Sequence, residues 1–290
     1  MAGNDSVAAI YRERAMNYEN VFDPETLHAR PRLRDGRFKE DFDLYSTHGQ
    51  GFIEGKSLNY SFDVPQDVDG LIRHMGGEEA FIGHLDHLFE MELSDEFFAH
   101  TEDVTREGLL GGYVHGNEPS HHVPFLYNWT SQPWKTQYWQ REIMDNMYRN
   151  NIDGLCGNDD CGQMSAWYIL SAMGFYSVCP GIDQYVLGAP YLPYMKLNLE
   201  NGKTFEIKAP KVSSRNRYVQ SVKLNGKPYT KGYITSKDIM EGGILEFTMT
   251  SKPNRKRQFT KNERPYSLSW NSGRSTRSGC ASMTDRSSSR

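Results

Sequence analysis

The chain has 290 residues, enough for one large domain or two ordinary ones with a substantial buried core. Its 33 Lys and Arg residues against 37 Asp and Glu residues give a net charge of −4, which argues against a general nucleic-acid binder. No window approaches the roughly 18 consecutive apolar residues of a transmembrane helix. The mean hydropathy of −0.70 agrees, so no membrane span is expected.

Two further properties of the composition bear on location and charge. The N-terminal residues contain neither a basic nor an apolar segment of the kind found in signal peptides. We therefore expect either a cytoplasmic protein or a chain whose natural N-terminus is not the printed one. The charge is unevenly distributed, because residues 251–290 sum to +8 and residues 1–250 to −12. The four cysteines are too few for a disulfide scaffold and favour structural or free thiols.

Apolar periodicity predicts helices over roughly the first 180 residues. Ser6 is suited to cap a first amphipathic helix, and the Pro- and Gly-containing stretch over residues 24–50 predicts a long irregular connection. Four further helical segments follow, at residues 68–75, 78–91, 133–150 and 163–173. The last of these is the most apolar and is expected to be buried on all sides.

After residue 180 the period changes to alternation. Short alternating runs are separated by Asn201-Gly202, Asn225-Gly226 and Gly242-Gly243, which are typical of hairpin turns. We therefore expect a helical region over 1–180 and an antiparallel β-rich region over 181–253. Residues 254–290 are basic and rich in Ser and Arg, without hydrophobic period, and are expected to be a disordered tail.

Glu54 lies in the first of three polar clusters that interrupt apolar or glycine-rich stretches. It stands among apolar and aromatic residues in the run GFIEG, and such surroundings raise a carboxyl pKa toward that of a general acid. An exposed loop glutamate is the alternative interpretation of this run.

The second cluster is the run GNEPSHH. Oxygen atoms from Asn117 and Glu118 suit a hard cation such as Ca2+. His121 and His122 are adjacent and do not form the spaced helical pair that zinc prefers, so they favour zinc only weakly. A structured turn whose histidines bond to backbone atoms is the alternative. The aromatic stretch that follows includes Trp129, which fits either a core position or a platform for a sugar ring.

The third cluster, GNDDCGQ, precedes the helix predicted over residues 163–173. A carboxylate at a helix N-terminus stays ionised, as a general base must. Either Asp159 or Asp160 could instead cap the helix, and one of the two could serve each purpose.

Taken in order, these segments resemble glycoside hydrolase family 92. The resemblance rests on GFIEG, VPQDVDGL, GNEPSHHVPFLYNW, DGLCGNDDCGQMSAWYILSAMGFYSVCPG and a strand-rich end with FEIKAP, and it runs from about Tyr11 to about Pro253. The family comprises calcium-dependent, inverting exo-α-mannosidases. The resemblance implies a mainly α fold followed by β structure, namely a partial (α/α)6 toroid and an antiparallel β region. It also implies mannose-containing glycans as substrate and an extracellular or periplasmic location.

The same resemblance implies roles for individual residues. Glu54 matches the acid and Asp160 the base, while Asn117 and Glu118 match the calcium motif. Contacts to the sugar are expected from Asn158, Asp159, His121, His122 and Trp129. The sequence EGKSLNY departs from the family pattern Glu-Gly-x-x-Trp-Gln-Tyr at Leu58 and Asn59, and Gln66 replaces a usual His. Family members also carry an N-terminal β-sandwich that would complete the site.

Three functions therefore stand as hypotheses. The leading one is part of a calcium-dependent exo-α-mannosidase, whether or not this fragment is active by itself. The second is a non-catalytic carbohydrate-binding or scaffold fragment of the same fold, favoured by the EGKSLNY departure and the absent sandwich. The third is a metal-dependent hydrolase that uses His121 and His122 with zinc or manganese.

Overall fold

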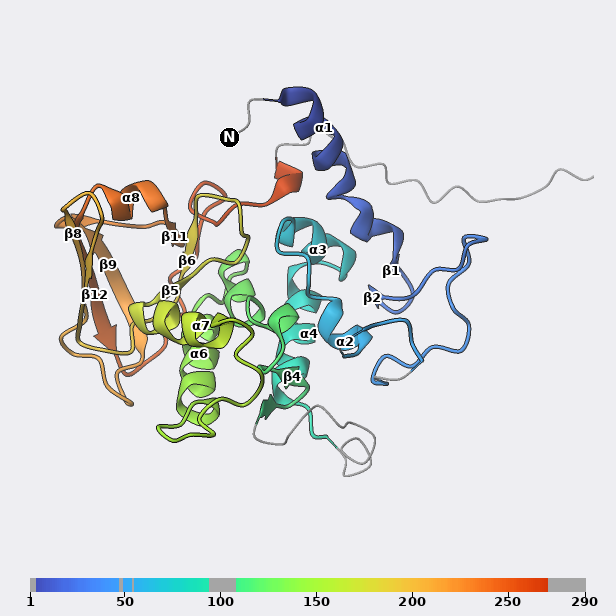
Figure 1. The fold of residues 1–290 in the computed structure, drawn as a ribbon, viewed down its shortest axis with the longest axis horizontal. Coiled ribbons are helices and arrows are strands. Elements are labelled where there is room, and N and C mark those ends of the chain that lie inside the picture. The colour runs from blue at the N-terminus through green and yellow to red at the C-terminus, as the bar shows by residue number, and fades with distance from the viewer. Residues whose placement is uncertain (1–3, 47–48, 54, 94–107, 271–290) are drawn as a thin grey trace, which may run out of the picture.

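The computed structural model describes residues 4–46, 49–53, 55–93 and 108–270, and it places helices before sheets along the chain (Figure 1). The α-helices of the first part are α1 (Asp5–Arg14), α2 (Ser57–Tyr60), α3 (Val68–His74), α4 (Glu78–Glu90), α6 (Trp134–Met147) and α7 (Gln163–Met173). The 3-10 helices are η1 (Asn17–Asn20), η3 (Glu118–Ser120) and η4 (Val123–Trp129). Two short hairpins, β1 (Phe22–Asp23) with β2 (His28–Ala29) and β3 (Leu109–Leu110) with β4 (Tyr113–Val114), connect them.

The sheets begin directly after α7. A three-stranded antiparallel sheet has the order β11-β6-β5, with β5 at Phe175–Tyr176, β6 at Tyr185–Leu187 and β11 at Tyr233–Ile234. A five-stranded sheet has the order β10-β9-β12-β8-β7. Its strands are β7 (Tyr194–Asn198), β8 (Thr204–Lys208), β9 (Tyr218–Leu224), β10 (Lys227–Pro228) and β12 (Gly243–Thr250), and α8 (Ser236–Met240) precedes β12.

The expectation of a purely antiparallel β region is wrong at one pairing. Strands β12 and β8 run parallel, with Leu245 opposite Ile207, while the other pairs of this sheet are antiparallel. Parallel neighbours need a crossover connection, which is supplied by the long segment containing β9, β10, β11 and α8.

Each part has its own hydrophobic core. The larger core lies among the helices and includes the fully buried rings of Phe62, Phe81, Phe125 and Trp167. The smaller core lies under the five-stranded sheet and includes Phe205, Ile207 and Leu245. Helix α6 connects the two parts, because the side-chain carbonyl of Gln137 accepts a 2.9 Å bond from the backbone N–H of Val219 on β9.

Helix α1 differs from the other helices because none of its residues is buried. It begins at Asp5 rather than after Ser6, since the side chain of Asn4 accepts the cap bond from Val7 N–H at 3.1 Å. Figure 1 shows it projecting from the rest of the molecule. No helix in the described ranges is long and apolar enough to span a membrane.

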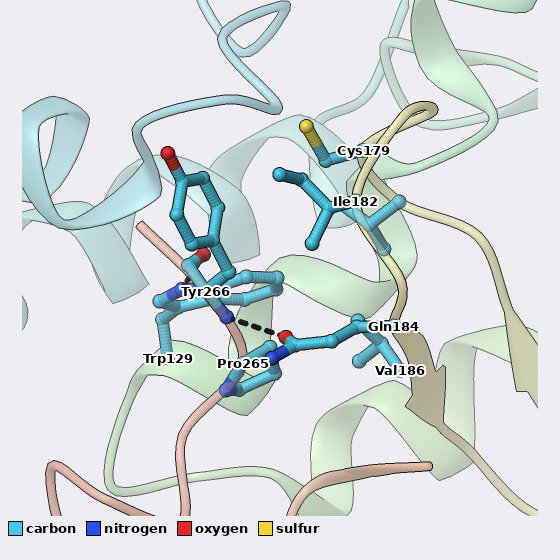
Figure 2. Close-up of a pocket in the computed structure, with 8 residues that line it drawn as sticks. Trp129, Cys179, Ile182, Gln184, Val186, Pro265 and Tyr266 are labelled. Atoms are coloured by element: carbon cyan, nitrogen blue, oxygen red, sulfur yellow. Dashed lines mark hydrogen bonds between the residues drawn. The ribbon is translucent and has the colours of Figure 1, made fainter. Parts of the chain in front are cut away.

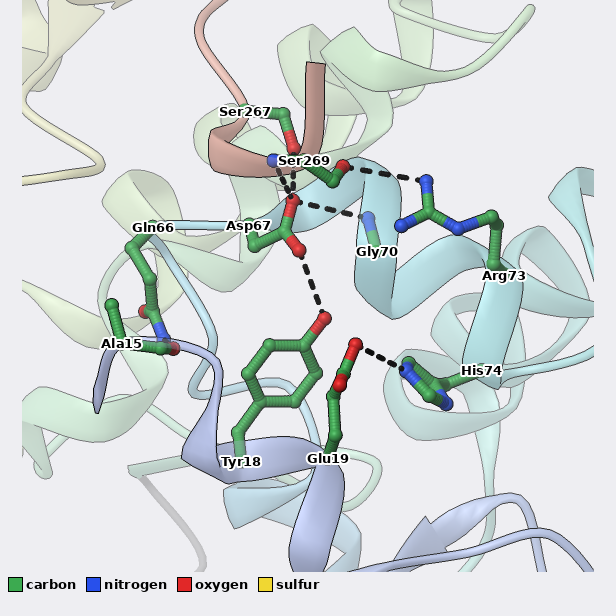
Figure 3. A network of polar contacts seen from close by, with 10 residues as sticks. All are labelled: Ala15, Tyr18, Glu19, Gln66, Asp67, Gly70, Arg73, His74, Ser267 and Ser269. Atoms are coloured by element: carbon green, nitrogen blue, oxygen red, sulfur yellow. Dashed lines mark hydrogen bonds and ion pairs between the residues drawn. The ribbon is translucent and has the colours of Figure 1, made fainter. Parts of the chain in front are cut away.

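The predicted disorder of the tail is wrong for residues 254–270. This segment ends in the 3-10 helix η5 (Leu268–Trp270), and the side chains of Phe259 and Leu268 are buried. The segment is held by Asp67, a carboxylate with no exposed surface. Asp67 accepts bonds from Ser267 Oγ at 2.6 Å and from the backbone N–H of Ser269 at 3.0 Å (Figure 3). Residues 271–290 lie outside the described residues.

Asp67 also ties the N-terminal part to the same point. The hydroxyl of Tyr18 donates to it at 3.0 Å, and the backbone N–H of Gly70 donates at 3.3 Å (Figure 3). Burial alone would raise the pKa of Asp67, but its hydrogen bonds from Ser267, Ser269 and Tyr18 hold that pKa below the usual range. The ionised carboxylate therefore connects η1, α3 and η5.

Candidate active site

Two glycines bring the second and third polar clusters together. A Cβ atom on Gly157 would lie 2.5 Å from the Cα atom of Gly116, and a Cβ atom on Gly116 would lie 3.1 Å from the Cα atom of Gly157. The two backbones therefore touch without room for side chains between them. As a result, the segment that carries Asn117 and Glu118 lies beside the segment 158–160.

The two neighbouring aspartates have different surroundings. Asp159 accepts a 2.9 Å bond from the backbone N–H of Ser165 and a 3.1 Å bond from its hydroxyl, so Asp159 caps the first turn of α7. It is half-buried, whereas Asp160 is exposed. The structure thus assigns the capping role to Asp159 and leaves the carboxylate of Asp160 available.

The turn at Asp160 has an unusual backbone. Asp160, Cys161 and Gly162 have consecutive φ angles of 43°, 59° and 97°, all in the left-handed region. For a residue other than glycine this conformation costs about 1–3 kcal/mol, and such residues cluster at functional sites. The backbone N–H of Asp160 donates to the side-chain carbonyl of Asn158 at 3.3 Å. Asn158 therefore supports the turn and is itself exposed.

His121 lies behind this turn with both ring nitrogens engaged. Its Nε2–H donates to the carbonyl of His115 at 2.8 Å, and the side-chain amide of Gln163 lies 3.3 Å from its Nδ1. Burial lowers the pKa of His121 to about 4, although the charge of Asp160 acts in the opposite direction. His121 is therefore neutral at neutral pH, and it is near Asp160.

His122 points to another part of the protein. Its Nε2 lies 2.8 Å from the carbonyl of Phe62, the side chain is buried, and burial lowers its pKa. Both histidines thus bond to backbone atoms, as the alternative interpretation of this turn required. Within the described ranges no group of three or more His, Cys, Asp or Glu residues could hold a metal ion.

Gln163 and Tyr176 complete the junction, and neither was identified from the sequence. The amide of Gln163 donates to the hydroxyl of Tyr176 at 3.1 Å. Burial raises the pKa of Tyr176 to about 12, and the nearby Glu118 carboxylate adds to this effect. Hydrogen-bond contacts therefore connect Tyr176 through Gln163 to His121, and the charge of Glu118 is near enough to act on Tyr176. The only signal for Gln163 was its place inside the third cluster, and Tyr176 gave none.

Glu54, the expected acid, lies outside the described residues. The residues after it approach the second cluster, since His122 bonds to Phe62 O and the side chain of Asn59 donates to the carbonyl of Gly112 at 2.9 Å. Lys56 is 1% exposed, and burial lowers its pKa to about 8. Leu58 is likewise 1% exposed, so neither Leu58 nor Asn59 offers an open surface in this structure.

The expectation that Trp129 binds sugar is not supported by its position. The ring is 1% exposed, and its Nε1–H donates to the carbonyl of Tyr266 at 3.2 Å. Figure 2 shows Trp129 among the residues that line a small pocket, together with Cys179, Ile182 and Tyr266. The aromatic residues of this stretch thus belong to the core, since Phe125, Tyr127 and Trp129 are all buried.

Asn117 and Glu118 have the right donor atoms for Ca2+, but they provide only part of the number of ligands that it requires. Both are half-buried at the start of η3 and carry hard oxygen donors. Ca2+ takes about six to eight oxygen ligands in proteins. Because the described residues contain no group of three acidic or histidine side chains around one point, these two would fill only part of that shell.

Comparison with known proteins identifies the family of this chain. The family model described as "Glycosyl hydrolase family 92 catalytic domain" matches residues 1–251 of this chain. A family GH92 α-mannosidase from Bacteroides thetaiotaomicron has 43% sequence identity and a TM-score of 0.81, over 88% of this chain and 33% of its own. The same enzyme in complex with mannoimidazole gives 43% identity and 0.81 over 88% of this chain and 34% of its own.

Two further relatives extend the comparison. A family GH92 inverting mannosidase from B. thetaiotaomicron VPI-5482 has 36% identity and a TM-score of 0.82, over 92% of this chain and 37% of its own. An uncharacterized secreted glycosidase of Arthroderma benhamiae is 28% identical over 207 residues, which is 70% of this chain and 24% of that protein. The chain therefore spans about a third or less of the length of these relatives. The resemblance found in the sequence is confirmed, and the chain belongs to glycoside hydrolase family 92.

Proposed function

We propose that this chain forms part of the active site of an inverting exo-α-mannosidase that removes terminal α-linked mannose from glycans. The observation that carries the proposal is the division of roles between Asp159 and Asp160. Asp159 caps α7, so Asp160 is an exposed carboxylate on a strained turn beside the Asn117–Glu118 segment. The solved relatives are described as α-mannosidases, one of them as inverting and one with bound mannoimidazole.

In this mechanism the chain supplies two carboxyl groups with opposite tasks. Glu54 protonates the departing glycosidic oxygen, and Asp160 removes a proton from the water that attacks the opposite face of the sugar. Inverting glycosidases place these groups about 6.5–9.5 Å apart, so that a water fits between the base and the sugar. His121 and Gln163 hold the turn that carries Asp160, and Asn158 and Asp159 border it. His122, buried against Phe62, positions the backbone beside them.

Asn117 and Glu118 are proposed as calcium ligands. A bound Ca2+ would orient the mannose hydroxyls and help to distort the ring. The remaining ligands would be water, sugar oxygens or groups from the longer protein, because the described residues supply only part of the shell. The donor chemistry of the two side chains supports this assignment.

The architecture and location of the whole protein follow the same proposal. The helices before residue 174 would form part of an (α/α)6 toroid, and the longer relatives leave room for a further domain such as the β-sandwich that would complete the site. The A. benhamiae relative is described as secreted, which supports an extracellular or periplasmic location. Immunodetection of the full gene product in culture medium, periplasm and cytoplasm tests the location, and recovery from the cytoplasm alone would contradict it.

A scaffold that binds glycans without turnover is a second candidate. The side chain of Leu58 is buried and Asn59 is engaged with Gly112, so the departure from the family pattern alters the surroundings of the acid.

One experiment separates the two candidates. The full gene product is incubated with an aryl α-mannoside, with and without a calcium chelator, and the anomer released is followed by NMR. The mannosidase predicts β-mannose as the first product and loss of turnover with chelator. Mannoside binding without release would support the scaffold, and neither binding nor release would contradict both.

A further inference from the structure

Three aromatic rings and two arginines form a continuous cluster on the surface where α6 meets β9, outside the Asp160 junction. Trp134 contacts Tyr218 edge to face, with ring centroids 6.4 Å apart. The guanidinium of Arg255 lies 5.1 Å from the centre of the Trp134 ring, and that of Arg217 lies 5.7 Å from the Tyr138 ring. All three rings are half-exposed. We name this group the α6–β9 cluster.

The segment after β12 adds positive charge to this surface. Its backbone is held against β9, because the side-chain amide of Asn254 donates to the carbonyl of Gln220 at 3.1 Å. Lys252, Arg255 and Lys256 are all exposed. Among the described residues no carboxylate forms an ion pair with any of the three, whereas Arg217 is paired with Glu142. Arg255 thus lies against the Trp134 ring, and two further cations without an ion pair among the described residues are close to it in the sequence.

The wider β region also carries an excess of positive charge. Residues 201–270 contain fifteen Lys and Arg residues against five Asp and Glu residues. This excess differs from the acidic character of residues 1–250 as a whole. A positive potential over one end of the molecule raises the local concentration of polyanions and their association rate.

We propose that the α6–β9 cluster, with Lys252 and Lys256, binds an acidic polysaccharide chain at a site separate from the Asp160 junction. Stacking on Trp134 orients the guanidinium of Arg255 while its N–H groups remain free for bidentate bonds to sulfate, phosphate or carboxylate. The half-exposed rings offer apolar surface to the sugar rings between those groups. The choice of a polysaccharide rests on the proposed function, since a glycosidase acts on glycan chains, and the positive charge of the cluster selects an acidic one.

Charge argues against the chain's own C-terminal end as the occupant of this surface. Residues 271–290 carry four arginines against one aspartate, so the chain's own end would be repelled. A second copy could bring its acidic part, and a single-stranded RNA could use the same rings and cations. Both are outcomes that the experiment separates from the polysaccharide.

The test measures binding of fluorescent dextran sulfate to the full chain by anisotropy, with neutral dextran of equal length as the control ligand. The variant Lys252→Ala/Arg255→Ala/Lys256→Ala is compared with Lys223→Ala/Lys227→Ala/Lys231→Ala. The second variant removes the same charge near the opposite end of β9. Trp134→Leu tests the aromatic part, and circular dichroism confirms that each variant is folded.

The proposal predicts salt-dependent binding of dextran sulfate, none of neutral dextran, about tenfold weaker binding for the first triple variant, and less than twofold change for the second. Equal losses in both triple variants would mean nonspecific charge attraction and would overturn the proposal. Tighter binding of single-stranded RNA of the same charge, or self-association in sedimentation velocity that the first variant abolishes, would overturn it in favour of those occupants. Because binding is measured without turnover, absence of α-mannosidase activity in the full gene product would contradict the mannosidase proposal and leave this result intact.

Discussion

Two adjacent aspartates at the N-terminus of α7 have different roles, a structural one for Asp159 and a proposed catalytic one for Asp160. Asp159 satisfies the N–H and hydroxyl of Ser165, and this allows the next residue to leave the helical path. Asp160 then adopts a left-handed conformation with its side chain exposed. The cost of that conformation is met by the bonds around the turn, which include Asn158 and the cap. The residue that stabilises the helix end and the proposed catalytic residue are therefore direct neighbours in the sequence.

This division predicts opposite effects for two isosteric substitutions. Asp160→Asn removes the proposed base, so turnover of an aryl α-mannoside should fall by at least about a thousandfold while the free energy of unfolding changes by less than about 0.5 kcal/mol. Asp159→Asn keeps a capping side chain but weakens the bonds to Ser165, and should cost about 0.5–1 kcal/mol. Steady-state kinetics and urea unfolding measure the two effects. Unchanged turnover in Asp160→Asn would assign the base elsewhere.

The buried histidines predict how stability depends on pH. Burial lowers the pKa of His121 to about 4 and also lowers the pKa of His115 and His122, whereas the unfolded value is about 6.5. Between these values the unfolded chain binds the proton and the folded chain does not. The stability that comes from keeping these histidines neutral is therefore complete above about pH 6.5. It is lost as the pH falls toward 4.

For His121 alone the expected loss between pH 7.5 and pH 4.5 is about 2–3 kcal/mol of unfolding free energy. Urea unfolding at a series of pH values measures it. His121→Gln should flatten the profile, while the same change at the exposed His87 should not. A flat profile in the unaltered chain would show that the histidines are accessible to protons when folded.

At the scale of elements, the junction depends on two backbones that approach within contact distance. Gly116 and Gly157 lie in loops before η3 and before α7, and their contact sets the distance between Glu118 and Asp160. Gln163 reinforces the same crossing through His121 and Tyr176.

Gly157→Ala is therefore expected to damage the junction. The added methyl group would lie 2.5 Å from the Cα atom of Gly116, so the loops must separate. We expect a loss of about 1–3 kcal/mol in unfolding free energy, together with reduced mannoside turnover. The control is Gly83→Ala on α4, where nothing lies within 4 Å of the new atom. Helix propensity there predicts a gain of about 0.5–1 kcal/mol in unfolding free energy. Equal effects of the two changes would show that the contact between Gly116 and Gly157 does not hold the junction together.

Glycines and apolar periodicity in the sequence correctly predicted where several helices begin and end, because those boundaries depend on neighbouring residues. Gly174 follows an apolar run and α7 ends there, with that glycine in the left-handed conformation at its C-cap. Gly76-Gly77 likewise separates α3 from α4. The parallel pairing of β12 with β8 was missed, because alternation specifies a strand but not its neighbour. The order of residues 254–270 was missed because Asp67 and Ser267, whose bond holds it, are 200 residues apart.

The candidate site was predictable only as a set of motifs. The clusters at 116–122 and 157–163 contain the residues that meet, yet the assignment of the cap to Asp159 needed the bond to Ser165. The sequence left Trp129 open between two interpretations, because an aromatic residue in an apolar stretch gives the same pattern in a core and at a sugar platform, and its burial in this structure favours the core. Tyr176 lies outside every polar cluster, and only its contact with Gln163 reveals it.

At the scale of the whole molecule, a helical part that carries the junction is joined to a basic β part through α6. The bond from Val219 to Gln137 and the α6–β9 cluster lie at this joint. The acidic residues are concentrated before residue 200, on the side of the proposed cation site, and the positive excess follows it. The charge distribution thus favours a cation at one part of the molecule and a polyanion at the other.

The proposed calcium site leads to a prediction for the whole chain. Asn117 and Glu118 supply few of the oxygen ligands that Ca2+ requires, so the isolated chain should bind it weakly, with Kd of about 0.1–1 mM. Ligand bound only by the folded state at ten times its Kd adds about 1.4 kcal/mol. For a chain of this size that corresponds to a rise of about 2–4 °C in Tm.

Thermal unfolding with Ca2+, with Mg2+ and with chelator measures the shift. Glu118→Gln should abolish the calcium effect, because the amide keeps the shape and removes the charge that attracts the cation. Glu200→Gln makes the same change at an exposed position in the β part and should preserve it. Mg2+ should have little effect, since it retains its water shell unless the geometry is nearly ideal. Equal shifts in both variants would place the cation away from Glu118, and the proton transfers assigned to Glu54 and Asp160 would then have to proceed without calcium at this junction.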